Sequence, residues 1–171
     1  MLRQLQHDVW ATERLLAHCR GLTDAQLDLT VPGTYGTVRR TLAHIVTSNE
    51  GYLVRLLGEL LHDPPFRLDH EITLDEGAAH LAHVKDGVAR LFTRGDLDGD
   101  RLIADTPLRR PGDPRFEMNA WAPLTQFVNH GSDHRSQINT ILSANGLEAP
   151  DLQVWPYAMD LGASREVKDT A

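Results

Sequence analysis

Apolar residues recur at a spacing of three and four positions along four long stretches of this chain, and that spacing constrains the fold more than any other feature. Each stretch spans several helical turns and is bounded by glycine, by proline or by a capping residue such as Thr73. Amphipathic helices of this length bury their apolar stripes against one another. The sequence therefore predicts an all-α fold, a four-helix bundle, with helices over residues 2–20, 37–61, 73–95 and 121–146.

The connection between the third and fourth predicted helices is longer and differs in character. Residues 102–103 and 116–118 are short apolar segments on either side of a Pro- and Gly-rich stretch. Two extended arms around a turn fit this pattern, so we expect a hairpin within the connection. No repeat or boundary divides the chain, which indicates a single domain over residues 1–171. We expect Trp155, Pro156 and Tyr157 to dock onto the bundle and the tail from about residue 160 to be flexible.

The composition is that of a globular protein and excludes several classes of function. Of the 171 residues, 41% are hydrophobic, and 17 Lys and Arg stand against 24 Asp and Glu, a net charge of −7. This acidic balance argues against nucleic-acid binding, which needs clustered cations. No apolar stretch reaches the roughly 20 residues of a membrane span. The single cysteine, Cys19, excludes an internal disulfide, and the absence of an apolar leader predicts a cytoplasmic protein.

Nine histidines stand out in the composition, and two of them have the spacing of a metal-binding pair. His130 and His134 lie four residues apart in the fourth predicted helix, so they project from nearly the same face, one turn apart. The helical wheel places His134 within the apolar stripe and His130 at its edge. Such a pair alone is more often hydrogen-bonded in a core than bound to metal, and an ion needs at least a third protein ligand.

His44, near the start of the second predicted helix, is the candidate for the third ligand. Its neighbours on the wheel are small or polar, Thr37, Thr41, Ser48 and Gly51. Two interpretations remain open: an exposed surface histidine, or a ligand beside a pocket at the edge of the bundle. His80 and His83, three residues apart on the third predicted helix, could form a rival pair, but solvation is the expectation for all the remaining histidines. They are His7, His18, His62, His70, His80 and His83.

Two segments of the chain resemble the signature regions of the DinB/YfiT-like family of bacterial metalloproteins. They are GTVRRTLAHIVTSNEGYL, which contains His44, and FVNHGSDHRSQINTIL, which contains His130 and His134. The first helix and the C-terminal segment also resemble this family, so the resemblance covers nearly the whole chain. It implies a four-helix bundle in which these three histidines hold one divalent ion, commonly zinc or nickel, and in which two subunits often pair as a homodimer. Members include transferases and isomerases that use low-molecular-weight bacterial thiols.

The chemistry expected of a three-histidine site follows from its neutral ligands, which leave the ion its full charge and at least one open position. Such an ion can lower the pKa of bound water for hydrolysis, or hold a thiol as its thiolate for transfer. Hydrolysis usually requires a carboxylate base, and the wheel places Glu50 and Asp133 away from their histidines. Cys19 is expected in the core. The sequence favours a metal-dependent transferase that uses an external thiol or another small molecule. The alternatives are a metal-dependent hydrolase, a non-catalytic metal-binding stress-response protein, and a bundle whose histidines are structural.

Four polar residues flank the three histidines and are candidates to orient them. Thr41 and Ser48 lie one turn on either side of the histidine in the second helix, Tyr52 lies two turns on, and Gln137 follows His134. Capping or packing is the more ordinary role for each of them singly. No catalytic residue is therefore assigned from the sequence, and no cofactor other than the ion is predicted.

Overall fold

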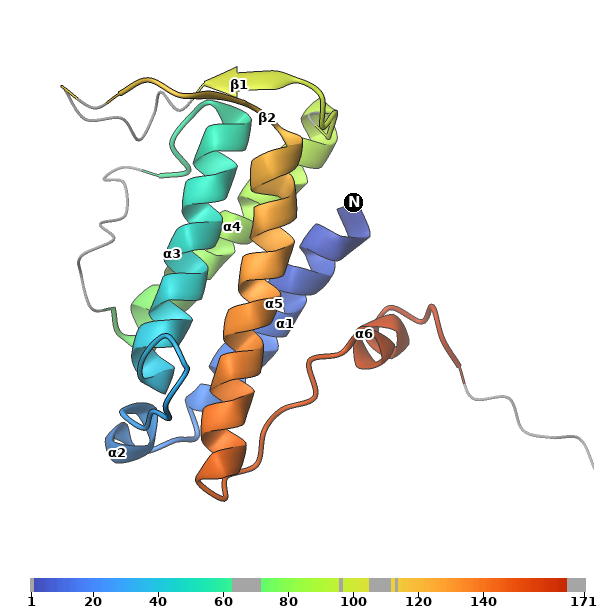
Figure 1. Ribbon diagram of the computed structural model, residues 1–171. Coiled ribbons are helices and arrows are strands. Elements are labelled where there is room, and N and C mark those ends of the chain that lie inside the picture. Colours follow the sequence, from blue (N-terminus) through green and yellow to red (C-terminus); the bar gives the residue numbers. More distant parts are fainter. Residues whose placement is uncertain (1, 63–71, 96, 105–111, 113, 166–171) are drawn as a thin grey trace, which may run out of the picture.

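The computed structural model describes residues 2–62, 72–95, 97–104, 112 and 114–165. Its elements are α1 (Leu2–Cys19), α2 (Asp24–Leu27), α3 (Val38–Leu57), α4 (Leu74–Arg94), β1 (Leu102–Ala104), β2 (Glu117–Asn119), α5 (Trp121–Ala144) and α6 (Val154–Asp160). The four long helices α1, α3, α4 and α5 confirm the predicted all-α architecture (Figure 1).

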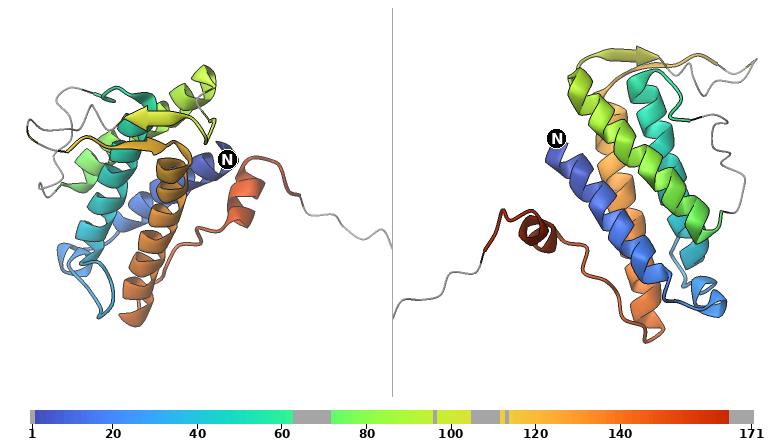
Figure 2. Two further views of the ribbon diagram at one scale, coloured as in Figure 1. Left: turned by 45° about the horizontal axis from the view of Figure 1, so that its top comes forward. Right: turned by 180° about the vertical axis from the view of Figure 1, so that it is seen from behind.

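The four long helices form a bundle in which α3 and α1 lie diagonally opposite. Each of these two helices packs against both α4 and α5. Figures 1 and 2 show α1 and α5 running in one direction and α3 and α4 in the other, so α3 and α5 are antiparallel whereas α3 and α4 are parallel. The chain must therefore return along the bundle between α3 and α4, a crossover beyond the single long connection that the sequence predicts. Residues 63–71 of this return, including His70, lie outside the described residues.

The predicted hairpin is confirmed between α4 and α5. β1 pairs with β2 in an antiparallel register that places Ile103 opposite Met118. The backbone amide of Trp121 then donates to the carbonyl of Gly99 at 2.8 Å, which joins the start of α5 to the approach to β1. The hairpin lies over the end of the bundle where α3 finishes and α5 begins (Figure 1). Most of its Pro-rich turn, residues 105–111 and 113, lies outside the described residues.

The ends of α3 are set by its capping residues. The Thr37 hydroxyl accepts a hydrogen bond from the backbone amide of Arg40 at 3.1 Å and caps the N-terminus. The sequence predicts a helix that continues to Leu61, but α3 ends at Leu57. The reason is that Gly58 adopts a left-handed conformation with φ of 70°, which turns the chain out of the helix.

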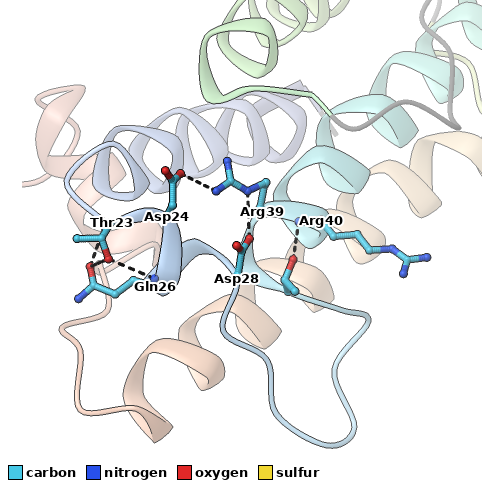
Figure 3. A network of polar contacts seen from close by, with 7 residues as sticks. Thr23, Asp24, Gln26, Asp28, Arg39 and Arg40 are labelled. Carbon is cyan, nitrogen blue, oxygen red and sulfur yellow. Dashed lines mark hydrogen bonds and ion pairs between the residues drawn. The ribbon is translucent and has the colours of Figure 1, made fainter.

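The loop that leads into α3 is fixed by ion pairs at its base (Figure 3). Arg39, in the first turn of α3, contacts Asp24 at 2.8 Å and Asp28 at 3.3 Å. Both carboxylates are more than half exposed, so these pairs position the chain more than they stabilise it. The loop between Asp28 and α3 carries Tyr35 and is therefore anchored at both of its ends.

A buried ion pair joins α1 to α5 inside the bundle. Nη2 of Arg135 donates to Oδ2 of Asp8 at 2.7 Å, and the two side chains are only 6% and 1% exposed. Asn49 of α3 donates to the other carboxylate oxygen at 3.0 Å, and Arg135 also donates to the Thr12 hydroxyl at 3.1 Å. Burial raises the pKa of Asp8, and the charge and hydrogen bonds of Arg135 and the amide of Asn49 oppose that rise. The apolar periodicity of the sequence gives no sign of this network.

The C-terminal segment docks onto α1, but only in part as predicted. Tyr157 of α6 is buried and its ring lies 5.4 Å from those of His7 and Trp10. Trp155, by contrast, is 71% exposed, which corrects the expectation that it packs on the bundle. His7 is half-buried, and its Nε2 lies 3.0 Å from the Leu152 carbonyl oxygen, so the prediction that it is solvated is wrong. Within the described residues, no helix combines the length and hydropathy that crossing a bilayer requires.

We predict that Gly131→Ala destabilises the fold through the buried ion pair. A methyl group at Gly131 would collide with both carboxylate oxygens of Asp8 and with Nη1 of Arg135. Overpacking of this kind costs about 1–3 kcal/mol in the free energy of unfolding, which urea denaturation measures. Gly77→Ala is the matched control, because its nearest side-chain atoms lie at 3.5 Å and 3.6 Å. Gly77→Ala should leave stability unchanged or raise it by up to about 1 kcal/mol. Equal effects of the two variants would contradict this account of the network.

Candidate metal centre

Three histidine rings from two helices converge at the interface between α3 and α5. The ring centroids of His130 and His134 lie 4.4 Å apart, and that of His44 lies 4.7 Å and 4.9 Å from them. Nε2 of His44 and Nε2 of His130 are 3.0 Å apart. One nitrogen from each ring lies within 4.8 Å of the other two, which is compact enough for a single ion. Of the two interpretations that the sequence leaves open for His44, the structure therefore favours a ring that faces the pair on α5.

The local sequence explains this convergence. His130 and His134 occupy successive turns of α5, so their rings lie one above the other. Arg135 is the next residue round the helix and is directed to Asp8 of α1, about 100° from the direction of His134. The antiparallel α3 then brings His44 against both rings.

A single side-chain amide positions two of the surrounding groups. Oε1 of Gln137 lies 3.2 Å from Nδ1 of His134 and accepts the backbone N–H of Tyr35 at 2.8 Å. A carbonyl-type oxygen is an acceptor only, so the His134 contact places the proton on Nδ1 and leaves Nε2 as a lone-pair donor. Gln137 thus orients a ring, the role for which the sequence nominated it.

Tyr35 is a site residue that sequence reasoning missed. Its ring stacks on that of His44, with centroids 4.1 Å apart and planes at 10°, and meets His134 edge-on at 5.1 Å. The guanidinium of Arg40 lies 5.4 Å from the Tyr35 ring centroid. Tyr35 sits in a loop with no helical periodicity, so the sequence carries no signal for it. Its packing against His44 is what prevents that ring from being an ordinary surface histidine.

The remaining nominated residues contact the site unequally. Ser48 Oγ lies 3.5 Å from Nδ1 of His44, at the limit of a hydrogen bond, and Tyr52 meets the His130 ring edge-on at 5.7 Å. The Thr41 hydroxyl is buried and has no hydrogen-bond partner among the described residues. Burial raises the pKa of Tyr52, which keeps its phenol protonated.

Two of the three rings, His44 and His130, are shifted toward the neutral form that a metal ligand requires. Burial, reinforced by the charges of His134 and His44, lowers the pKa of His130 to about 4. Burial, His134 and Arg40 likewise lower the pKa of His44. No carboxylate belongs to this group among the described residues. The candidate donor set is therefore made of imidazoles alone.

Comparison with known proteins places the chain in a family. The family model described as the DinB family matches residues 1–160. The chain belongs to the DinB family. It is 21% identical over 144 residues to Protein DinB of Bacillus subtilis (strain 168), a match that covers 82% of this chain and 83% of that protein. A crystal structure of a DinB-like protein from Bacillus cereus ATCC 10987 matches with a TM-score of 0.57 at 22% identity, over 86% of this chain and 94% of that one. This likeness confirms the expected fold.

The DinB chain also brings together histidines that the sequence assigns to solvent. Glu50, which faces away from His44, contacts His62 at 2.8 Å and His80 at 3.1 Å. The side chains of His62 and His80 are 16% and 18% exposed, so the expectation that they are solvated is wrong. His83 is exposed, as predicted. His18 is half-buried, with a buried Nε2, which corrects the expectation for that residue.

The pKa values of the DinB site predict how zinc binding depends on pH. Protons would compete with added zinc for the same ring nitrogens, so the affinity for zinc should decline as pH falls toward 4. The decline should be steepest toward pH 4, because the pKa of His130 is lowered to about 4 and that of His44 is also lowered. Equilibrium dialysis between pH 7.5 and pH 4, at fixed total zinc, measures this. Equal affinity at pH 7 and pH 4 would show that imidazoles are not the ligands.

Gln137→Ala should weaken zinc binding without unfolding the DinB bundle. The variant removes the acceptor that orients His134 and the contact that holds the Tyr35 backbone. Loss of such an orienting partner typically lowers metal affinity by about 10- to 100-fold. The matched control is Ser136→Ala at the adjacent, exposed position, which should bind zinc like the parent. A competition titration against a chromophoric chelator measures the zinc affinity of both variants. Equal affinities of Gln137→Ala and Ser136→Ala would show that Gln137 does not support the site.

Proposed function

We propose that this chain is a metal-dependent enzyme in which His44, His130 and His134 hold one divalent ion, zinc or nickel, and which transfers a group to an external thiol. The observation that carries the proposal is the convergence of three imidazoles, with one nitrogen of each within 4.8 Å of the others. Imidazole suits both zinc and nickel. Three protein ligands leave at least one position for a substrate, which is the arrangement of catalytic sites.

The neutral donor set suits activation of a thiol. Ligands without charge leave the positive charge of a bound ion uncompensated, and such an ion holds a coordinating thiol as its thiolate. The protein residues contribute orientation in this scheme. Gln137 holds His134, and the stacked Tyr35 ring holds His44 and covers one side of the site.

The reacting thiol is expected to come from outside the chain. Cys19 is the single cysteine of the sequence, and its side chain is fully buried. Burial raises the pKa of this thiol to about 12, so it stays protonated at neutral pH. An internal nucleophile is therefore disfavoured, and a low-molecular-weight thiol is the natural co-substrate.

The absence of a carboxylate from the three-histidine group, among the described residues, disfavours the hydrolase alternative. Metal-dependent hydrolysis usually relies on a carboxylate that takes the proton of the attacking water. Among the described residues, none belongs to the three-histidine group: Glu50 is engaged with His62 and His80, and Asp133 is exposed on α5. A thiol loses its proton on coordination and needs no such base.

Charge at the exposed side of the site supports an anionic thiol as the small-molecule partner. Arg40 is exposed, lies over the Tyr35 ring and lowers the pKa of His44 by its charge. A thiol that carries a carboxylate would find a cation next to the site. We further propose a single domain over residues 1–171 and a cytoplasmic location, and, from the family resemblance, a homodimer.

Metal content and activity of histidine variants test the proposed function. Each single histidine variant removes one of three ligands, so it should bind one fewer zinc or nickel ion per chain and should no longer transfer electrophiles to bacterial thiols. The variants are His44→Ala, His130→Ala and His134→Ala. Cys19→Ala is the control and should keep both the bound ion and the transferase activity. Metal is measured by plasma mass spectrometry and transfer by consumption of free thiol.

The pattern of activity separates the alternatives. Hydrolysis of esters or amides without thiol consumption would overturn the transferase proposal in favour of a hydrolase. Stoichiometric metal with no turnover on any panel would instead indicate a metal-binding protein. Loss of activity in Cys19→Ala would contradict the external thiol.

A further inference from the structure

A second cluster of metal-ligating side chains lies on the opposite flank of α3. Glu50 of α3 is buried, with its side chain 5% exposed, and each of its carboxylate oxygens faces a different histidine. Oε1 lies 2.8 Å from Nε2 of His62 in the segment after α3, and Oε2 lies 3.1 Å from Nδ1 of His80 on α4. One ligand atom from each of the three residues lies within 4.8 Å of the other two.

We infer that Glu50, His62 and His80 form a second binding site, for a divalent transition-metal ion of the zinc class. Two imidazoles and one carboxylate are an established zinc ligand set and leave positions for water. The carboxylate distinguishes this site chemically from the three-histidine group, since it offsets one unit of the ion's charge. This site extends beyond the proposed function, which does not use it.

The geometry of His62 favours metal ligation over a simple hydrogen bond. Its Nε2 lies 2.8 Å from Oε1 of Glu50 but is buried and has no hydrogen-bond partner among the described residues. The N–H or lone-pair direction of this nitrogen therefore does not point at the oxygen. Nε2 of His62 and Oε1 of Glu50 lie side by side, so both atoms can face the position of a shared metal ion. Ligands at about 2.1 Å from a tetrahedral ion are about 3.4 Å apart, so a small outward shift would admit one.

The segment that carries His62 is held in place by its neighbours. Leu61 packs so closely on Gly87 of α4 that a methyl group there would lie 3.1 Å from one of its carbons. Glu59 contacts Arg90 at 2.8 Å and Arg94 at 2.7 Å. The backbone on the N-terminal side of His62 is thus fixed to α4, the helix that supplies His80, and little reorganisation is needed to bind an ion.

The two ligand groups are separate in space and share no residue. Glu50 lies six residues beyond His44 on α3, which places it about 9 Å further along the helix and about 120° round it. An ion between Glu50, His62 and His80 would join α3, the segment after it and α4. Because α3 and α4 are parallel and lack a short connection, such a cross-link should raise the thermal stability of the bundle.

Zinc titration of metal-free protein in variants of each site tests this inference. Wild type should bind two equivalents, and His134→Ala, which removes a ligand of the three-histidine group, should bind one. Adding Glu50→Gln or His80→Ala to that background should reduce binding to none and abolish the rise in melting temperature that zinc produces. Glu50→Gln alone should retain one equivalent, so a failure of this site is distinguishable from a failure of the proposed function.

His83→Ala is the matched control. Its ring stacks on His62 with centroids 4.5 Å apart, but it does not belong to the ligand group, so in the His134→Ala background one equivalent should remain. If Glu50→Gln does not fold by circular dichroism, His62→Ala, at a side chain 16% exposed, makes the same test. The inference is overturned if His134→Ala binds no zinc, if the Glu50, His62 and His80 variants leave its single equivalent intact, or if His83→Ala removes it.

Discussion

The buried contact between Asp8 and Arg135 is the interaction on which the rest of this structure depends. It brings a guanidinium and a carboxyl group together inside the bundle at 2.7 Å, and Asn49 joins α3 to the same carboxyl group. Removing one partner of such a pair costs about 3–5 kcal/mol, because the other charge is left buried and uncompensated. The pair therefore sets how α5 is rotated: with Arg135 directed to α1, His134 is directed to α3. The direction in which α5 presents His130 and His134 therefore follows from the ion pair.

The sequence is sufficient to predict what depends on local periodicity. The four long helices, the Thr73 cap with Glu76 three residues on, and the pairing of His130 with His134 all follow from spacings of three or four residues. Periodicity alone gives the wrong C-terminal end for α3. Apolar residues continue at helical spacing past Gly58, but the backbone leaves the helix there. His44 shows the limit of this reasoning, because the helical wheel cannot distinguish a surface ring from one that a loop will cover.

Long-range contacts account for what could not be predicted. Tyr35 meets His44 through a loop whose course depends on Arg39, Asp24 and Asp28. Glu50 meets His62 and His80 only because the chain turns out of the helix at Gly58 and α4 packs beside α3. Neither the contact of Tyr35 with His44 nor that of Glu50 with His62 and His80 corresponds to a regular spacing in the sequence. Charge and burial, rather than spacing, identify these residues once the fold is known.

The two ligand groups divide α3 into two chemically different flanks. Toward α5 lies an uncharged set of three imidazoles beside an exposed cation, which suits a catalytic ion and an anionic thiol. Toward α4 lies a mixed set that includes a buried carboxylate, which suits an ion that holds helices together. The two proposed sites differ in the charge of their ligand atoms. This difference gives a physical reason why α3 could contribute to two sites with different roles.

The central claim is that one ion is shared by α3 and α5. The most direct measurement is an anomalous-difference map from crystals of the zinc-loaded protein, collected on either side of the zinc absorption edge. The account predicts a peak about 2.1 Å from one ring nitrogen each of His44, His130 and His134. A peak bound by the two α5 histidines, with the His44 ring turned away from it, would contradict the account.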